Sequence, residues 1–230
     1  MVTIFRFVII IFSTIFIPGC YSADDYLRQS NACADKGDYK KAIELIDKAI
    51  KINPKHKGAF LNRGLCHEKL KQFKEAIADY NQLLKIDPKN TYAFYNIGTC
   101  SYDLNEFQMA VDYYNKALKT KGVPDEQDSS KSFIMISTNP SFDENARFDV
   151  SLYQIYYQRG LAYYQLNDFR NSFKDFKKCM LVNEYRMDSQ YMIALCYIES
   201  GDKEKGCAVL DKCISMGDTL ALRKKQEVCK

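Results

Sequence analysis

Apolar and polar residues follow the pattern of amphipathic helices over about residues 23–120 and 151–229. The apolar stretches come in pairs. The members of a pair are separated by a short turn such as Lys36-Gly37-Asp38 or Ser200-Gly201-Asp202. The pattern therefore predicts an all-α protein built from helical hairpins.

The hairpins repeat about every 34 residues, a period that is typical of repeat proteins. Small residues, aromatic residues after the turn, and prolines that end the second helix all recur at this spacing: Ala42, Ala76 and Ala110; Tyr39, Phe73 and Phe107; Gly64 and Gly98; Pro54 and Pro88. The second half keeps the spacing, from Gly160 to Ala194 and from Cys179 to Cys213. The step from Gly98 to Gly160 is longer than one period and shorter than two, so an insert separates the third repeat from the fourth.

These recurring positions resemble the tetratricopeptide repeat family. The second repeat carries the family pattern most fully, with Phe60, Gly64, Phe73, Ala76, Tyr80 and Pro88. The resemblance implies a right-handed α-α superhelix of about five helix-turn-helix repeats. Residues 20–120 would hold repeats one to three, residues 121–150 an acidic polar insert, and residues 151–218 repeats four and five. Residues 219–230 would form a capping helix, and the last repeat also resembles Sel1-like repeats.

The burial of apolar surface requires the same stacked architecture. One hairpin cannot bury its own apolar stripe, so several must stack around a shared core. Small residues such as Gly64 and Gly98 allow paired helices to approach closely. A capping helix at residues 219–230 would cover the open end of the stack.

Residues 1–19 resemble a bacterial lipoprotein signal peptide. The apolar run from Phe7 to Ile17 is too short to span a membrane. Ile17 and Gly19 stand three and one positions before Cys20, which the resemblance makes the lipidated residue. Tyr21 follows Cys20, which favours an outer-membrane destination over retention at the inner membrane. A plain secretory signal and an uncleaved anchor are the alternatives.

The insert at 121–150 differs from the repeats. From residue 122 to residue 150 it contains two prolines and six acidic residues against two basic ones. Its apolar centre runs from Phe133 to Ile136. A loop of this length is either functional or irregular. We therefore keep two interpretations open: a loop resting on the solenoid, or a segment that contacts a partner or partly fills the concave groove.

The composition limits the functions that the chain can have. The chain has 33 basic and 29 acidic residues and a net charge of +4, which is too balanced for a nucleic-acid-binding protein. Only two histidines, His56 and His67, are present, and no phosphate loop, dinucleotide fingerprint or hydrolase motif occurs. We expect no catalytic residues, no metal, no cofactor and no small-molecule substrate.

Eight cysteines follow Cys20. Equivalent positions in neighbouring repeats are too far apart for a disulfide, so Cys66, Cys100, Cys179 and Cys213 are expected to be core residues. In an antiparallel hairpin, facing residues have a constant sum of residue numbers. A turn near Asp218 pairs Cys207 with Cys229, and a turn near Gly201 pairs Cys196 with Cys207. We favour the first pairing, because a terminal helix gains the most stability from a covalent link.

The resemblance also assigns a binding face. Tetratricopeptide solenoids bind peptides or protein surfaces on the concave face, which the first helix of each repeat lines. The corresponding residues here include Asn31, Asn62, Tyr92, Tyr95, Asn96, Tyr102, Tyr157, Gln158, Tyr164 and Tyr191. One subfamily clamps a C-terminal carboxylate with lysine, two asparagines, lysine and arginine. Asn31 and Asn62 match its asparagines, but Leu27, Tyr92 and Asn96 replace its cations, which favours neutral, polar or aromatic ligands.

These observations favour a non-enzymatic scaffold or adaptor that binds a protein or peptide partner. It would be attached by a lipid to the membrane of the bacterial cell envelope. A secreted, host-directed interaction protein is one alternative. A cysteine-based thiol or metal enzyme is the other.

Overall fold

A computed structural model describes residues 21–120 and 150–229. The signal peptide, Cys20 and nearly all of the acidic insert lie outside these residues. The described part contains eleven helices and no strand, as expected for an all-α repeat protein. The helices are α1 (Ala23–Ala34), α2 (Tyr39–Ile52), α3 (Lys57–Lys69), α4 (Phe73–Ile86), α5 (Thr91–Asp103), α6 (Phe107–Lys119), α7 (Leu152–Gln165), α8 (Phe169–Cys179), α9 (Asn183–Glu199), α10 (Lys203–Ser215) and α11 (Thr219–Val228).

Helix ends are set by local chemistry. Ser22 forms a capping box with Asp25 at the start of α1, and aspartates accept the N-terminal amide hydrogen bonds of four later helices. Pro54 and Pro88 each come shortly after the end of a second helix. None of the described helices has the length and apolar character needed to cross a membrane.

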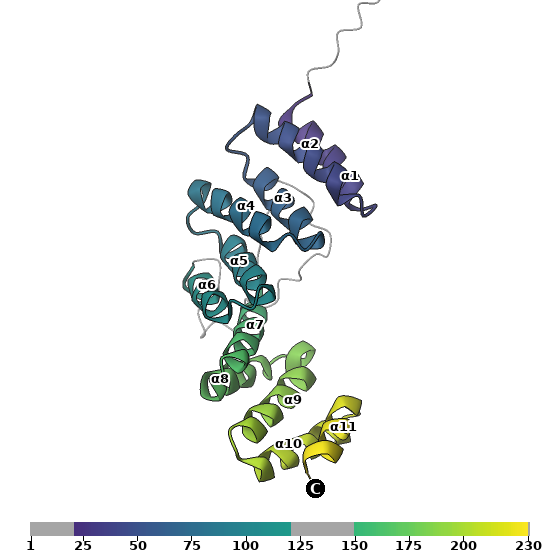
Figure 1. Ribbon diagram of the computed structural model, residues 1–230, viewed down its shortest axis with the longest axis vertical. Coiled ribbons are helices and arrows are strands. Elements are labelled where there is room, and N and C mark those ends of the chain that lie inside the picture. Colours follow the sequence, from purple (N-terminus) through teal and green to yellow (C-terminus); the bar gives the residue numbers. More distant parts are fainter. Residues whose placement is uncertain (1–20, 121–149, 230) are drawn as a thin grey trace, which may run out of the picture.

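Consecutive helices pack side by side to form a curved stack (Figure 1). Helices α3, α5, α7 and α9 lie on the inner side of the curve, and α4, α6 and α8 lie on the outer side. Five clusters of buried apolar residues follow one another along this stack. Because each cluster is shared between neighbouring repeats, no hairpin holds its core alone.

The stack continues across the insert. Helix α7 packs directly on α6, although residues 120–151 lie between the two helices in the chain. Val150 is only 3% exposed and joins Ala110, Val111 and Ile155 in one apolar cluster. The fourth repeat therefore takes the place that an uninterrupted array would give it.

A disulfide between Cys207 and Cys229 fastens the last helix to α10, with 6.0 Å between the two Cα atoms. This is the pairing that the sequence favoured. Cys196, the rival partner, is a buried free thiol whose Sγ lies 3.4 Å from the hydroxyl of Ser172. Cys66, Cys100, Cys179 and Cys213 are buried free thiols in the apolar clusters or beside them, as expected for core residues.

Candidate functional site

All ten residues predicted for the binding face lie on the first helices of their repeats. They are distributed over α1 (Asn31), α3 (Asn62), α5 (Tyr92, Tyr95, Asn96, Tyr102), α7 (Tyr157, Gln158, Tyr164) and α9 (Tyr191). We call this inner surface the groove face. Asn62, Tyr95 and Asn96 are buried, and the other seven are half-buried.

Two asparagines are linked at the N-terminal end of the groove face. The Asn62 side-chain amide donates to the Asn31 Oδ1 atom at 3.4 Å, which joins α1 to α3. Asn62 is only 3% exposed, and its own Oδ1 is buried without a hydrogen-bond partner. Leaving a buried acceptor unpaired costs about 1–3 kcal/mol, so an approaching N–H group would find a favourable site there.

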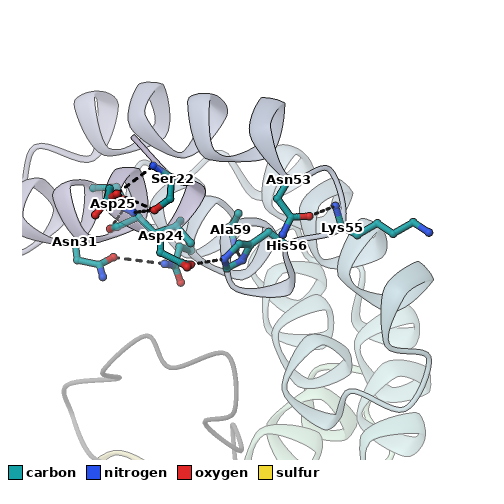
Figure 2. Close-up of polar contacts among 11 residues, drawn as sticks. Ser22, Asp24, Asp25, Asn31, Asn53, Lys55, His56 and Ala59 are labelled. Carbon is teal, nitrogen blue, oxygen red and sulfur yellow. Dashed lines mark hydrogen bonds and ion pairs between the residues drawn. The ribbon is translucent and has the colours of Figure 1, made fainter. Parts of the chain in front are cut away.

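His56 supports this end of the stack. Its Nδ1 accepts the Ala59 amide hydrogen bond at the start of α3, which leaves Nε2 to donate to Asp24 on α1 at 3.0 Å. Figure 2 shows the His56 ring between α1 and α3, with Asn31 on the same side of α1 as Asp24. The buried His56 therefore links α1 to the start of α3.

The middle of the groove face contains a second buried amide. Asn96 on α5 is 5% exposed, and its Nδ2 atom is buried without a hydrogen-bond acceptor. Tyr92 stands one helical turn earlier. Burial raises the pKa of its phenol. A buried amide donor beside an aromatic ring is suited to hold a peptide carbonyl group.

Tyr95 contributes less surface than the sequence suggested. It is 7% exposed, and its ring packs in the core with Val111 and Tyr114. The Tyr95 hydroxyl has a polar neighbour, since it accepts a hydrogen bond from Gln154 Nε2 at 2.9 Å. The Oε1 atom of Gln154 is buried and unpaired, like the amide groups of Asn62 and Asn96.

Aromatic residues dominate the C-terminal half of the face. The rings of Tyr157 on α7 and Tyr185 on α9 lie 5.4 Å apart, and Tyr157 also meets Phe176 edge-on at 5.6 Å. Tyr164 packs edge-on against Phe169. Burial raises the pKa of Tyr185 to about 12, so this phenol is neutral at physiological pH.

One carboxylate is enclosed between α3, α4 and α5. Glu68 accepts a 2.6 Å hydrogen bond from the hydroxyl of Tyr80 and a 3.5 Å contact from the Cys100 thiol. Burial raises the pKa of Glu68, the two hydrogen bonds oppose that shift, and the nearby carboxylate of Asp103 adds to it. Its surroundings are those of a structural carboxylate that links the three helices.

A separate open cavity of about 480 Å³ lies against α7 and α8. Arg159 and Asp175 line it together with three lysines of α8, which are Lys174, Lys177 and Lys178. Arg159 is engaged by Asp175 and Asn115, so its charge is already compensated. This basic surface is distinct from the groove face, to which the sequence assigned the ligand.

The described residues offer little to a catalytic or metal-binding interpretation. They contain no group of three or more histidine, cysteine or acidic side chains that could hold a metal ion. Burial raises the pKa of Cys66 and Cys213 to about 11 and that of Cys179 to about 12. A thiol nucleophile needs the opposite shift.

Sequence reasoning missed two groove residues, Gln154 and Tyr185. Gln154 stands in the same relation to Tyr92 as Gly160 does to Gly98, so the repeat register could have identified it. Tyr185 had no such signal. Helix α9 begins at Asn183, earlier than the repeat register requires, and this extension brings Tyr185 to Tyr157.

Comparison with known families matches tetratricopeptide repeat models to five segments: 23–56, 59–90, 91–121, 153–185 and 188–216. Together they span more than half of the chain and leave the insert unmatched. The last segment is the one that also resembled a Sel1-like repeat, and that finer assignment stays a prediction.

Several solved structures have the same fold. A tetratricopeptide repeat protein from Parabacteroides merdae is 21% identical, with a TM-score of 0.69, over 90% of this chain and 72% of that one. MamA is 18% identical, with a TM-score of 0.67, over 89% and 94% of the two chains. YrrB, described as having an unusual peptide-binding site, is 18% identical, with a TM-score of 0.67, over 89% of this chain and 92% of that one. At these identities the likeness establishes the fold alone.

One curated relative is heat shock protein STI1 of Saccharomyces cerevisiae, which is 44% identical over 54 residues. That match spans 23% of this chain and 9% of the yeast protein. It therefore represents shared repeats and not a shared overall organisation.

Proposed function

Because this chain belongs to the tetratricopeptide repeat family, we propose that it is a non-enzymatic scaffold that binds an extended peptide or protein segment on its groove face. The observation that carries this proposal is the set of buried, unpaired polar atoms on successive first helices: Asn62 Oδ1, Asn96 Nδ2 and Gln154 Oε1. Buried polar atoms are normally hydrogen-bonded, and exceptions call for an explanation. A bound peptide main chain would supply the missing partners.

The half-buried aromatic residues support the same proposal. Tyr157, Tyr164 and Tyr191 combine large apolar rings with hydroxyl groups, the combination that is enriched in protein interfaces. The solenoid holds them on rigid helices, so little backbone entropy would be lost on binding. YrrB provides a precedent for a peptide-binding site in a protein of this fold.

We further propose that the protein is anchored by lipid on Cys20 in a bacterial cell envelope, at the outer membrane. The support is the sequence alone: a short apolar segment, Ile17 and Gly19 before the cysteine, and Tyr21 after it. Each buried methylene of a lipid contributes about 0.8 kcal/mol, so more than one acyl chain gives stable anchoring. Labelling with a fatty-acid analogue should mark the wild type and spare a Cys20→Ala variant.

The binding proposal is tested by affinity capture from detergent-solubilised membranes. We compare the wild type with a triple variant that carries Gln158→Ala, Tyr164→Ala and Tyr191→Ala, all at half-buried positions of the groove face. A control with Gln108→Ala and Tyr113→Ala changes the outer helix α6 instead. A partner lost only in the triple variant would support binding on the groove face. A partner retained by the triple variant and lost in the control would contradict it.

A further inference from the structure

We infer that the ligand of the groove face carries a lysine or arginine side chain, and that Tyr157, Tyr185 and Asp188 hold its cation. The inference rests on the proposed function, because it assigns ligand chemistry to the same surface. It also goes beyond the neutral, polar or aromatic ligand that the sequence favoured.

The two tyrosine rings meet where α7 packs against α9. The rings of Tyr157 and Tyr185 are 5.4 Å apart and inclined at 35°. The edge-on contact with Phe176 fixes the Tyr157 ring. Asp188 is exposed and lies one helical turn beyond Tyr185, near enough to the Tyr157 phenol to raise its pKa, although burial is the larger cause. Two aromatic rings beside a carboxylate suit an ammonium or guanidinium group, which is attracted by both.

The charges around the other groove tyrosines point the same way. Burial is the main cause that raises the pKa of these phenols, and nearby carboxylates add to it. The neighbours are Glu68 for Tyr92, Glu199 for Tyr164, and Asp218 and Glu227 for Tyr191. Arg223, beside Tyr191, is a cation that opposes them. Carboxylates thus lie beside several of the groove tyrosines, although the whole chain has a net charge of +4.

Part of the compensating positive charge lies elsewhere. Lys174, Lys177 and Lys178 line the separate cavity against α7 and α8, and the Lys178 ammonium sits 4.2 Å from the centroid of the Tyr156 ring. This contact shows that a tyrosine of α7 already receives a cation within the molecule. Like charges across an interface are costly, so the carboxylates beside the groove tyrosines disfavour an acidic ligand.

The buried amides explain why the ligand should be an extended segment rather than a free cation. Asn62 presents an unpaired acceptor and Asn96 an unpaired donor, and the two residues are only 3% and 5% exposed. They lie on the first helices of neighbouring repeats, α3 and α5. An extended main chain offers one N–H and one C=O per residue, which are the two complementary groups. The cation then selects among peptides that the amides alone would accept.

The test uses labelled short peptides that differ only in their central side chains, which are lysine, arginine, glutamine or glutamate. Fluorescence anisotropy is measured with the full chain, with Asp188→Asn and with Tyr157→Leu. The control is Asp112→Asn, which removes the same charge from an exposed position on the outer helix α6. Thermal unfolding verifies that each variant is folded.

We expect the lysine and arginine peptides to bind about tenfold more tightly than the glutamine peptide, and the glutamate peptide to bind most weakly. Asp188→Asn and Tyr157→Leu should each reduce that preference by about three- to fivefold. Asp112→Asn should leave it unchanged. An equal loss in Asp112→Asn would indicate general charge attraction and overturn the inference.

Two further outcomes separate this inference from the proposed function. If all four peptides bind alike, and binding is lost in the Gln158→Ala, Tyr164→Ala, Tyr191→Ala variant, the cation site is wrong and the scaffold proposal stands. If no peptide binds, the cation site is also wrong. Affinity capture then decides the scaffold proposal independently.

Discussion

The guanidinium of Arg159 donates two hydrogen bonds of 2.7 Å to the carboxylate of Asp175, one from Nε and one from Nη2. Its remaining nitrogen donates to Asn115 of the preceding repeat at 2.6 Å. Arg63 makes the same arrangement with Asp79 and Asp47, and it directly precedes Gly64 as Arg159 directly precedes Gly160. An arginine at this place thus joins three helices in the second and fourth repeats.

Removing Arg159 should be strongly destabilising. Asp175 is 2% exposed, so Arg159→Met leaves a buried carboxylate without its guanidinium, a loss of about 3–5 kcal/mol. The double change Arg159→Met with Asp175→Leu should recover most of this stability, because it removes the buried charge as well. Urea unfolding followed by circular dichroism measures both effects. Equal stability of the single and double variants would refute the expectation.

Two glycines of α3 should respond in opposite ways to alanine. A Cβ atom at Gly64 would lie 2.6 Å from the Tyr80 ring, whereas one at Gly58 would meet its nearest neighbour, His56, at 3.4 Å. Gly64→Ala should therefore cost about 1–3 kcal/mol through overpacking. Gly58→Ala should gain up to about 1 kcal/mol from helix propensity. Thermal unfolding of the pair checks the sign of each effect, and a stabilised Gly64→Ala would show that the Tyr80 ring can move.

Reduction of the Cys207–Cys229 disulfide should release α11 and leave the rest of the stack folded. The two cysteines are separated by 22 positions, for which the chain-entropy contribution is about 3 kcal/mol. Ala221 is the one residue of α11 that is buried, so the helix has little else to hold it. Hydrogen exchange should show faster exchange of α11 amides after reduction. The variant with Cys207→Ser and Cys229→Ser should exchange fast with or without reductant.

The free thiols should differ sharply in reactivity. In a Cys20→Ser protein at about pH 8, a disulfide reagent should modify Cys33 quickly, because Cys33 is only half-buried and the reagent can reach it. The five buried thiols should react only after urea is added. Mass spectrometry locates the modified cysteines. Rapid modification of Cys179 in the folded protein would contradict the buried site and revive a thiol-enzyme hypothesis.

The same thiols should make the fold sensitive to alkaline pH. Burial raises the pKa of Cys179 to about 12 in the folded protein, while an unfolded thiol titrates near about 8.5. Between these values the folded state holds a proton that the unfolded state has lost, so stability falls as the pH rises. The slope is at most about 1.4 kcal/mol per pH unit for each thiol. Cys179→Ala should lower the measured slope of unfolding free energy against pH, and an unchanged slope would argue against the shift.

Repeat spacing allowed much of the fold to be predicted. The constant repeat interval placed helices, turns and helix-ending prolines, and the antiparallel register paired Cys207 with Cys229. These features are local or periodic, so sequence alone carries them. The groove face was predictable only as a set of helix positions. Whether a given tyrosine points to solvent or to the core depends on neighbouring repeats, as the buried ring of Tyr95 shows.

An array of helical hairpins with a break after the third follows from the amino-acid sequence, because amphipathic spacing and small residues at fixed intervals permit few other packings. Which polar atoms are left unpaired and which rings meet depends on the three-dimensional packing of the helices. Asn62 and Asn96 look like ordinary helix residues until stacking removes their Oδ1 and Nδ2 atoms from water. Tyr185 joins Tyr157 only because α9 starts early. Burial and contact between distant residues arise from the stacking of whole helices, and no local pattern records them.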